Sequence, residues 1–249
     1  MTDKFALKKL IAAAQLKPKD VVLEIGPGVG NLTQELAKKV KKVIAVEKDP
    51  RMIDILGETL EGFQNVEIIQ GDILKIPDSK FLIHNSYKVV ANLPFYLTAP
   101  VIRKFLEKEN QPEFMVFIVQ KEVAQRICAK PPAMSLLAVS VQLYAKPKIM
   151  SYVSKKSFWP QPKVDSAIIK LEIRNSKFAI DSKAFFRVVK AGFSSPRKQL
   201  VNNLSKGLKL DKAKVSRWLL KNNIKPEQRA ETLTVDDWLS LQKSFSSFF

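Results

Sequence analysis

Short runs of β-branched and aliphatic residues alternate with amphipathic stretches through the first part of this chain. Five runs are expected to be strands, namely Val21–Ile25, Val43–Val46, Val66–Ile69, Val89–Ala91 and Phe114–Val119. Stretches expected to be helices lie between them, at Leu32–Val40, Pro50–Leu60 and Ala99–Glu107. This alternation is typical of βαβ units and predicts an α/β protein with a mainly parallel sheet. Such sheets bind ligands at the carboxyl ends of their strands.

The pattern changes in the second part of the chain. Leu136–Tyr144 and Ala167–Ile173 are rich in Val, Ile and Tyr and are expected to finish the sheet as an antiparallel pair. Four amphipathic stretches follow, at Ala184–Phe193, Gln199–Leu208, Lys212–Asn222 and Val235–Phe245. The sequence therefore predicts two domains, an α/β domain over residues 1–178 and a small helical domain over residues 179–249.

The charge of the chain is strongly basic and unevenly distributed. Its 42 Lys and Arg against 24 Asp and Glu give a net charge of +18. Residues 1–150 hold 22 basic and 16 acidic side chains, a net +6, and residues 151–249 hold 20 and 8, a net +12. This excess favours a polyanionic partner, either nucleic acid or an anionic membrane surface.

Other features restrict the compartment and exclude a structural metal. The longest apolar run, Phe114–Val119, is far too short to span a bilayer, so we expect no membrane association through a transmembrane helix. A single Cys128 and an N-terminus without an apolar leader predict a cytoplasmic protein. Since His84 is the only histidine, the chain offers no set of soft ligands for zinc, and we expect no metal.

A glycine-rich loop follows the first expected strand and opens a helix, in the order Glu24-Ile25-Gly26-Pro27-Gly28-Val29-Gly30. Glycines at alternate positions let the backbone turn sharply and approach a ligand closely. The spacing differs from the G-x-G-x-x-G of dinucleotide-binding proteins, and no phosphate-binding Lys with Ser or Thr follows. The loop favours an adenosine ligand without phosphates, although a purely structural turn would also need glycines.

Two acidic residues follow the next expected strands. Glu47 ends the second strand, where a carboxylate can accept both hydroxyl protons of a ribose. Asp72 follows the third strand, where it can accept from an adenine amine while a neighbouring backbone N–H, such as that of Ile73, reaches a ring nitrogen. Either acid alone fits a solvated or helix-capping role equally well, but together they predict an adenosine site.

The fourth expected strand runs into Asn92-Leu93-Pro94-Phe95. The Asn92 side-chain oxygen and the Leu93 carbonyl can both accept from an exocyclic amine, Pro94 stiffens the turn, and Phe95 can stack on a planar base. Accepting both amine hydrogens aims the nitrogen lone pair at an electrophile, so catalysis would come from positioning and electrostatics. The alternative is an ordinary turn after a strand.

These four elements, in this order, resemble the motifs of the KsgA-type family of small-subunit ribosomal RNA adenine-N6 dimethyltransferases. The resemblance continues through Gln120–Arg126, Phe158–Ala167, Phe193–Leu200 and Arg229–Leu233. It implies a Rossmann-like class I methyltransferase sheet with a C-terminal helical rRNA-binding domain. It also implies S-adenosyl-L-methionine as methyl donor and dimethylation of two adjacent adenosines in the 3′-terminal hairpin of small-subunit (16S) rRNA. The expected partner is the immature 30S subunit, bound by a monomer.

The resemblance also implies roles for individual residues. Asn92 would face both cofactor and target, and Phe95 and Phe158 would stack on the two faces of a flipped-out base. Expected cofactor contacts are made by Glu24, Gly26, Gly28, Glu47, Asp72, Ile73 and Asn92. Lys155, Lys156, Arg197 and Lys198 are expected to contact RNA phosphates, with plain surface solubility as the alternative. Trp159, Trp218 and Trp238 are better assigned to packing than to base stacking.

Two departures from the family pattern leave alternatives open. Members usually carry a Gly-Gln-Asn/His-Phe-Leu segment that covers the cofactor, and Met1–Phe5 has no counterpart, which points to a truncated or misassigned start. Phe95 also replaces a common Tyr. The alternatives are an Erm-type large-subunit rRNA adenine methyltransferase, against which the strings Phe158–Ala167 and Arg197-Lys198 argue, and a non-catalytic ribosome-assembly factor with a retained cofactor pocket.

Overall fold

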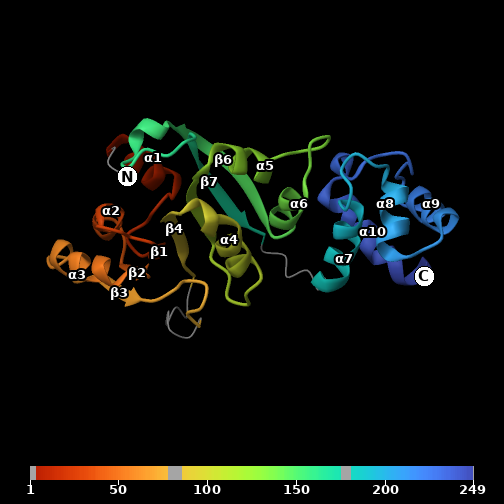
Figure 1. The fold of residues 1–249 in the computed structure, drawn as a ribbon. Coiled ribbons are helices and arrows are strands. Elements are labelled where there is room, and N and C mark those ends of the chain that lie inside the picture. Colours follow the sequence, from red (N-terminus) through yellow and green to blue (C-terminus); the bar gives the residue numbers. More distant parts are fainter. Residues whose placement is uncertain (1–3, 78–85, 175–180, 249) are drawn as a thin grey trace. The chain divides into compact units, whose positions relative to one another are not determined.

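The computed structural model describes residues 4–77, 86–174 and 181–248, and within them a seven-stranded sheet has the order β3-β2-β1-β4-β5-β7-β6 (Figure 1). The strands are β1 (Val21–Ile25), β2 (Lys42–Glu47), β3 (Val66–Gln70), β4 (Lys88–Asn92), β5 (Phe114–Gln120), β6 (Ala145–Val153) and β7 (Ser166–Ile173). The first five run parallel, and β7 is antiparallel to both β5 and β6. The predicted α/β sheet with an antiparallel end is confirmed.

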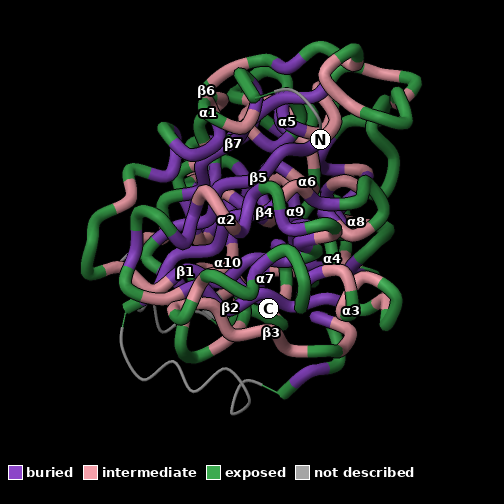
Figure 2. The backbone as a smooth tube through the Cα atoms, turned by 90° about the vertical axis from the view of Figure 1, so that its left-hand side faces the viewer, coloured by how far each residue is buried: buried purple, intermediate pink, exposed green. Residues whose placement is uncertain are grey.

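The central strands owe their sequence pattern to burial on both faces. Every residue of β5 from Phe114 to Val119 is buried, as are most residues of β1, β2 and β4, which Figure 2 shows in purple. A strand covered on both sides gives a continuous apolar run and not an alternating one. On one face, apolar residues of α1 (Lys4–Ala13) and α2 (Asn31–Ala37) pack against Val22, Val43 and Val116.

The remaining helices of this part lie in the connections between successive strands. They are α3 (Pro50–Thr59), η2 (Phe95–Leu97), α4 (Thr98–Leu106), α5 (Lys121–Ile127) and η3 (Lys155–Ser157). The start of α3 follows from its sequence, because Pro50 holds the first helical position and the Asp49 carboxylate accepts the Arg51 N–H at 3.0 Å. The helices predicted at Leu32–Val40, Pro50–Leu60 and Ala99–Glu107 are confirmed to within a few residues by α2, α3 and α4.

The prediction of a strand over Leu136–Tyr144 is wrong, because this segment forms helix α6 (Leu136–Gln142) and the strand β6 comes after it. Ser135 caps the helix by accepting the Ala138 N–H at 3.2 Å. Val139 and Leu143 then lie four residues apart and both enter an apolar core. A short apolar run does not by itself distinguish a buried helix from a strand, and here packing decided.

The chain divides into two compact units, one of residues 1–125 and 145–173, and one of residues 126–144 and 174–249. The second, the helical unit, contains α6, α7 (Ser182–Gly192), α8 (Leu200–Leu208), α9 (Lys212–Lys221), η4 (Ala230–Thr232) and α10 (Val235–Phe248). Trp218 and Trp238 are fully buried in its core. The predicted boundary at residue 178 lies outside the described residues, as does His84. The prediction placed residues 126–144 in the first domain, whereas they belong to the helical unit.

Helices long and apolar enough to cross a membrane are absent from the described part of the chain.

Candidate active site

The glycine-rich loop leaves β1 with a backbone that only glycine adopts readily. The φ angles of Gly26, Gly28 and Gly30 are +69°, +58° and +84°. A Cβ atom on Gly26 or Gly28 would meet nothing within 4 Å, whereas one on Gly30 would lie 3.2 Å from Leu56 Cδ2. The first two glycines therefore present bare backbone to open space, and the third is needed where α2 packs closely.

Glu47 fixes this loop to the end of β2. One carboxylate oxygen, Oε2, accepts the Gly28 N–H at 3.2 Å, and Oε1 accepts the N–H groups of Lys48 and Asp49 at 2.7 and 2.9 Å. The Gly71 N–H, at the end of β3, donates to the Glu47 carbonyl at 2.7 Å. Since each carboxylate oxygen has two lone pairs, Glu47 retains one of them, on Oε2, for a ribose hydroxyl while it joins three strand ends.

Glu24 places a second carboxyl group below the loop. Its side chain is 1% exposed, and burial raises its pKa to about 8, with the Glu47 carboxylate adding to the rise and the Thr33 side chain opposing it. Within the described residues, no hydrogen bond reaches the buried Oε2 atom of Glu24. An unsatisfied buried acceptor beside a bare glycine backbone fits a ligand that carries an ammonium group, such as the methionine part of S-adenosylmethionine.

Asp72 stands at the end of β3, on the far side of Glu47. Its Oδ1 atom accepts the Leu74 N–H at 3.0 Å, and its Oδ2 atom accepts from Lys48 Nζ at 3.1 Å; together they lower its pKa, so the carboxylate is ionised at neutral pH. Ile73 beside it is buried. The sequence analysis did not anticipate Lys48, whose side chain is largely exposed and must share Asp72 with any amine that binds there.

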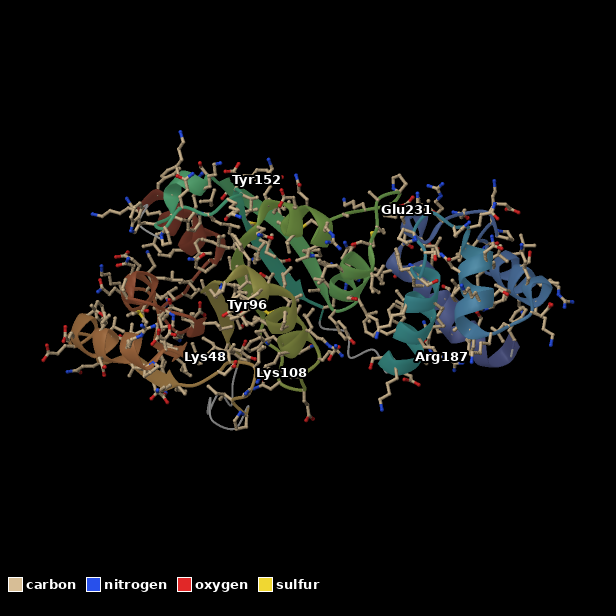
Figure 3. The ribbon with its side chains drawn as sticks, in the orientation of Figure 1. Lys48, Tyr96, Lys108, Tyr152, Arg187 and Glu231 are labelled. Carbon is tan, nitrogen blue, oxygen red and sulfur yellow. The ribbon has the colours of Figure 1, made fainter. Side chains whose placement is uncertain are left out.

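Asn92 ends β4 beside the glycine-rich loop. The register pairs Glu24 of β1 with Val90 of β4, so Asn92 ends the strand next to the one from which the glycine-rich loop leaves. Leu93 is buried, whereas Phe95 is partly exposed and Tyr96 is highly exposed on the η2 turn that follows (Figure 3). The turn thus places polar acceptors and aromatic rings next to the open space above the glycines.

The loop of residues 154–165 reaches the same edge of the sheet from β6 and β7. The register pairs Val153 with Ser166 and Ser166 with Gln120, at the carboxyl end of β5. Within this loop Phe158 packs against the core formed with α1 and α2, and Lys156 is exposed whereas Lys155 is half-buried.

The expectation that all three tryptophans serve packing holds for Trp218 and Trp238 but is wrong for Trp159, which is 80% exposed. Its neighbour Phe158 packs against the core, and the indole of Trp159 is exposed to solvent.

Arg197 and Lys198 lie in the helical unit, both exposed in the turn between α7 and α8. The buried Asn203 of α8 supports this turn, because its Nδ2 atom donates to the carbonyls of Gly192 at 2.7 Å and Ser195 at 2.9 Å. The sequence analysis missed Asn203. A polar residue among the apolar positions of an amphipathic helix was the available signal.

The sheet order, with an antiparallel β7, together with the glycine-rich loop and the acidic strand ends, defines a class I methyltransferase. The family model "Ribosomal RNA adenine dimethylase" matches residues 1–247, and the chain belongs to this family. It is 45% identical over 238 residues to a ribosomal RNA small subunit methyltransferase A of Dehalococcoides mccartyi, covering 94% of this chain and 82% of that protein.

Two solved structures are similar along almost the whole chain. A dimethyladenosine transferase from Plasmodium falciparum superimposes with a TM-score of 0.84 at 29% identity, covering 100% of this chain and 98% of the other. The 23S rRNA methyltransferase ErmE gives a TM-score of 0.79 at 25% identity, with 98% of both chains covered. The likeness therefore includes the helical unit as well as the sheet.

Proposed function

We propose that this protein transfers methyl groups from S-adenosylmethionine to the N6 atoms of two adjacent adenosines in the 3′-terminal hairpin of small-subunit rRNA, two to each, during ribosome assembly. The observation that carries the proposal is that Asn92 ends β4, the strand paired with β1, whose own end continues into the bare backbone of Gly26 and Gly28. The family and the names of its small-subunit relatives support this choice over a large-subunit substrate. The protein acts in the cytoplasm, as a monomer, on an immature subunit.

The residues present fit S-adenosylmethionine, which when bound supplies an electrophilic methyl group on a sulfonium. An ammonium group would draw Glu24 into its ionised form, and its Oε2 atom would accept a hydrogen bond from that group, while the open backbone at Gly26 and Gly28 would leave room for the methionine part. The Glu47 carboxylate accepts from the ribose hydroxyls, and Asp72 accepts from the adenine amine.

Asn92 and Leu93 act on the target amine. The lone pair of an adenine N6 atom is delocalised into the ring, so the amine is a poor nucleophile. When the Asn92 side-chain oxygen and the Leu93 carbonyl accept its two hydrogens, the nitrogen becomes more tetrahedral and its lone pair is directed at the methyl carbon. The new N–C bond would form as the donor's S–CH3 bond breaks and leaves a neutral thioether, and the amine would then lose its proton to water, so no strong base is needed.

Phe95 and Phe158 hold the target base. The N6 atom is inaccessible within a stacked helix, so the nucleotide must be extruded, and stacking on aromatic side chains offsets the lost base stacking. Phe95 is partly exposed next to Asn92, and the partly buried Phe158 belongs to the loop at the same sheet edge. Lys155, Lys156, Arg197 and Lys198 contact the RNA backbone.

The test is transfer of tritiated methyl groups to undermethylated small subunits, followed by mapping of the modified bases. We expect label on two adjacent adenosines near the 3′ end of the small-subunit rRNA. The variant Asn92→Ala should lose methyl transfer while its RNA affinity and melting temperature stay close to those of the wild type. Label on large-subunit RNA would favour an Erm-type activity. Absence of label would favour a non-catalytic assembly factor. Full turnover by Asn92→Ala would show that this residue takes no part in the mechanism.

A further inference from the structure

Trp159 is the most exposed of the large apolar side chains in the described residues, with 80% of its surface accessible. An indole exposed to water does not gain the free energy that burial of a large aromatic side chain contributes to folding. Tryptophan is enriched where one part of its ring system contacts an apolar partner and another part meets water. The side chain is therefore a candidate contact for a partner.

The backbone that carries Trp159 is anchored on both sides. Ser154 Oγ accepts the Lys156 N–H at 3.3 Å, and Asp165 Oδ1 accepts the Lys155 N–H at 2.9 Å. The Asp165 carbonyl in turn accepts the Lys121 N–H at 3.0 Å, which ties the loop to the end of β5. The two ends of the loop that carries Trp159 are thus fixed by hydrogen bonds.

The surroundings of Trp159 fit a nucleic acid better than a protein or a lipid surface. The segment of residues 154–165 contains Lys155, Lys156 and Lys163 against one acidic residue, Asp165, whose side chain already accepts a backbone N–H. Cations on the same loop as an exposed aromatic ring match the phosphates and bases of an unpaired RNA strand. The loop also lies at the sheet edge that holds Asn92, as the pairing of Val153 with Ser166 and of Ser166 with Gln120 places it.

We propose that Trp159 stacks on an unpaired base of the RNA substrate that neighbours the extruded adenosine, with Lys156 and Lys163 contacting the adjoining phosphates. The inference rests on the proposed function, because it takes the RNA strand at the site as given. Extrusion of one nucleotide removes a stacking partner from its neighbour, and the indole replaces that partner. Phe158, which packs against the core, stacks on the extruded target base and not on its neighbour.

Tryptophan fluorescence reports this contact directly. The chain contains three tryptophans, and Trp218 and Trp238 are fully buried, so the solvent-exposed emission belongs to Trp159. We expect an RNA hairpin with two adjacent unpaired adenosines in its loop to quench this emission and protect it from acrylamide. A fully paired RNA duplex of the same length should quench it much less. Equal quenching by both RNAs, or none by the hairpin, would overturn the inference.

Two variants extend the test. Trp159→Ala should weaken hairpin binding and raise the KM for methylation about tenfold, within the range for loss of one base–aromatic stack. Trp159→Phe should recover most of this affinity but show no RNA-dependent quenching, because only the buried tryptophans remain. Since the side chain is exposed, both variants should melt at the wild-type temperature.

The outcomes separate this inference from the proposed function. One outcome is that the wild type methylates small-subunit rRNA while Trp159→Ala keeps the same KM and RNA affinity. This result would overturn the role of Trp159 and leave the proposed function intact. Quenching by intact small subunits but not by the hairpin would also overturn it, since the indole would then contact a ribosomal protein. If the wild type methylates no RNA but the hairpin still quenches Trp159, the proposed activity fails and the RNA contact stands.

Discussion

At the scale of single residues, the buried Glu24 carboxyl makes stability depend on pH. Its pKa is about 8 in the folded protein and 4.5 in the unfolded chain. Below the lower value the group is protonated in both states. Between the two values the unfolded chain releases the proton and the folded protein keeps it, so the free energy of unfolding falls as the pH rises and the contribution is lost above pH 8.

The variant Glu24→Gln should therefore lose this part of the pH dependence. Between pH 5 and 8 the free energy of unfolding of the wild type should fall by about a few kcal/mol, and that of the variant should stay constant because the amide does not ionise. Urea unfolding at several pH values measures the difference, with the exposed Glu58→Gln as control. Parallel pH profiles for wild type and Glu24→Gln would show that the carboxyl is ionised in the fold.

At the scale of elements, the glycine-rich loop allows a matched comparison. Gly28→Ala introduces a Cβ into open space at a φ of +58°, so its cost to stability, about 1–2 kcal/mol, comes from the backbone conformation alone. The same methyl group should obstruct S-adenosylmethionine and weaken its binding in calorimetry. Gly62→Ala, which also meets nothing within 4 Å but lacks a positive φ, should change neither quantity. Unchanged affinity in Gly28→Ala would place the cofactor elsewhere.

Asn203 provides a second prediction at this scale. Asn203→Ala leaves the carbonyls of Gly192 and Ser195 without their buried donor, which should lower stability by about 1–3 kcal/mol. The turn that carries Arg197 and Lys198 loses its support, so RNA affinity should fall as well. Denaturant unfolding and RNA titration measure both effects, with the half-buried Asn202→Ala as the neighbouring control. Full retention of stability in Asn203→Ala would contradict the support assigned to it.

The elements also show which parts of the fold a sequence can predict. The five parallel strands were predictable because they are rich in β-branched and aliphatic residues, and the polar residues at three of their ends, Glu47, Asp72 and Asn92, followed from their positions. Strand β6 was missed because Lys146, Pro147 and Lys148 make it resemble a loop, although Lys and Pro are usual on an edge strand. The exposure of Trp159 and the Lys48–Asp72 pair depend on tertiary packing, which no local pattern contains.

At the scale of the whole molecule, the net charge of +18 governs association with RNA. Each phosphate contact releases counterions, so the logarithm of the affinity should fall linearly and steeply with the logarithm of the salt concentration. Arg197→Ala and Lys198→Ala should each flatten the slope by about 1. Lys221→Ala, an exposed lysine on α9, is the control. A salt-independent affinity would contradict the role given to these cations.

The most direct test of the account is a crystal structure with S-adenosylmethionine bound. We expect the cofactor at the ends of β1, β2, β3 and β4, with its ammonium group on Glu24, its ribose on Glu47, its adenine on Asp72 and its methyl group facing Asn92. Electron density for the cofactor at any other place, or protein side chains filling that site, would contradict this expectation.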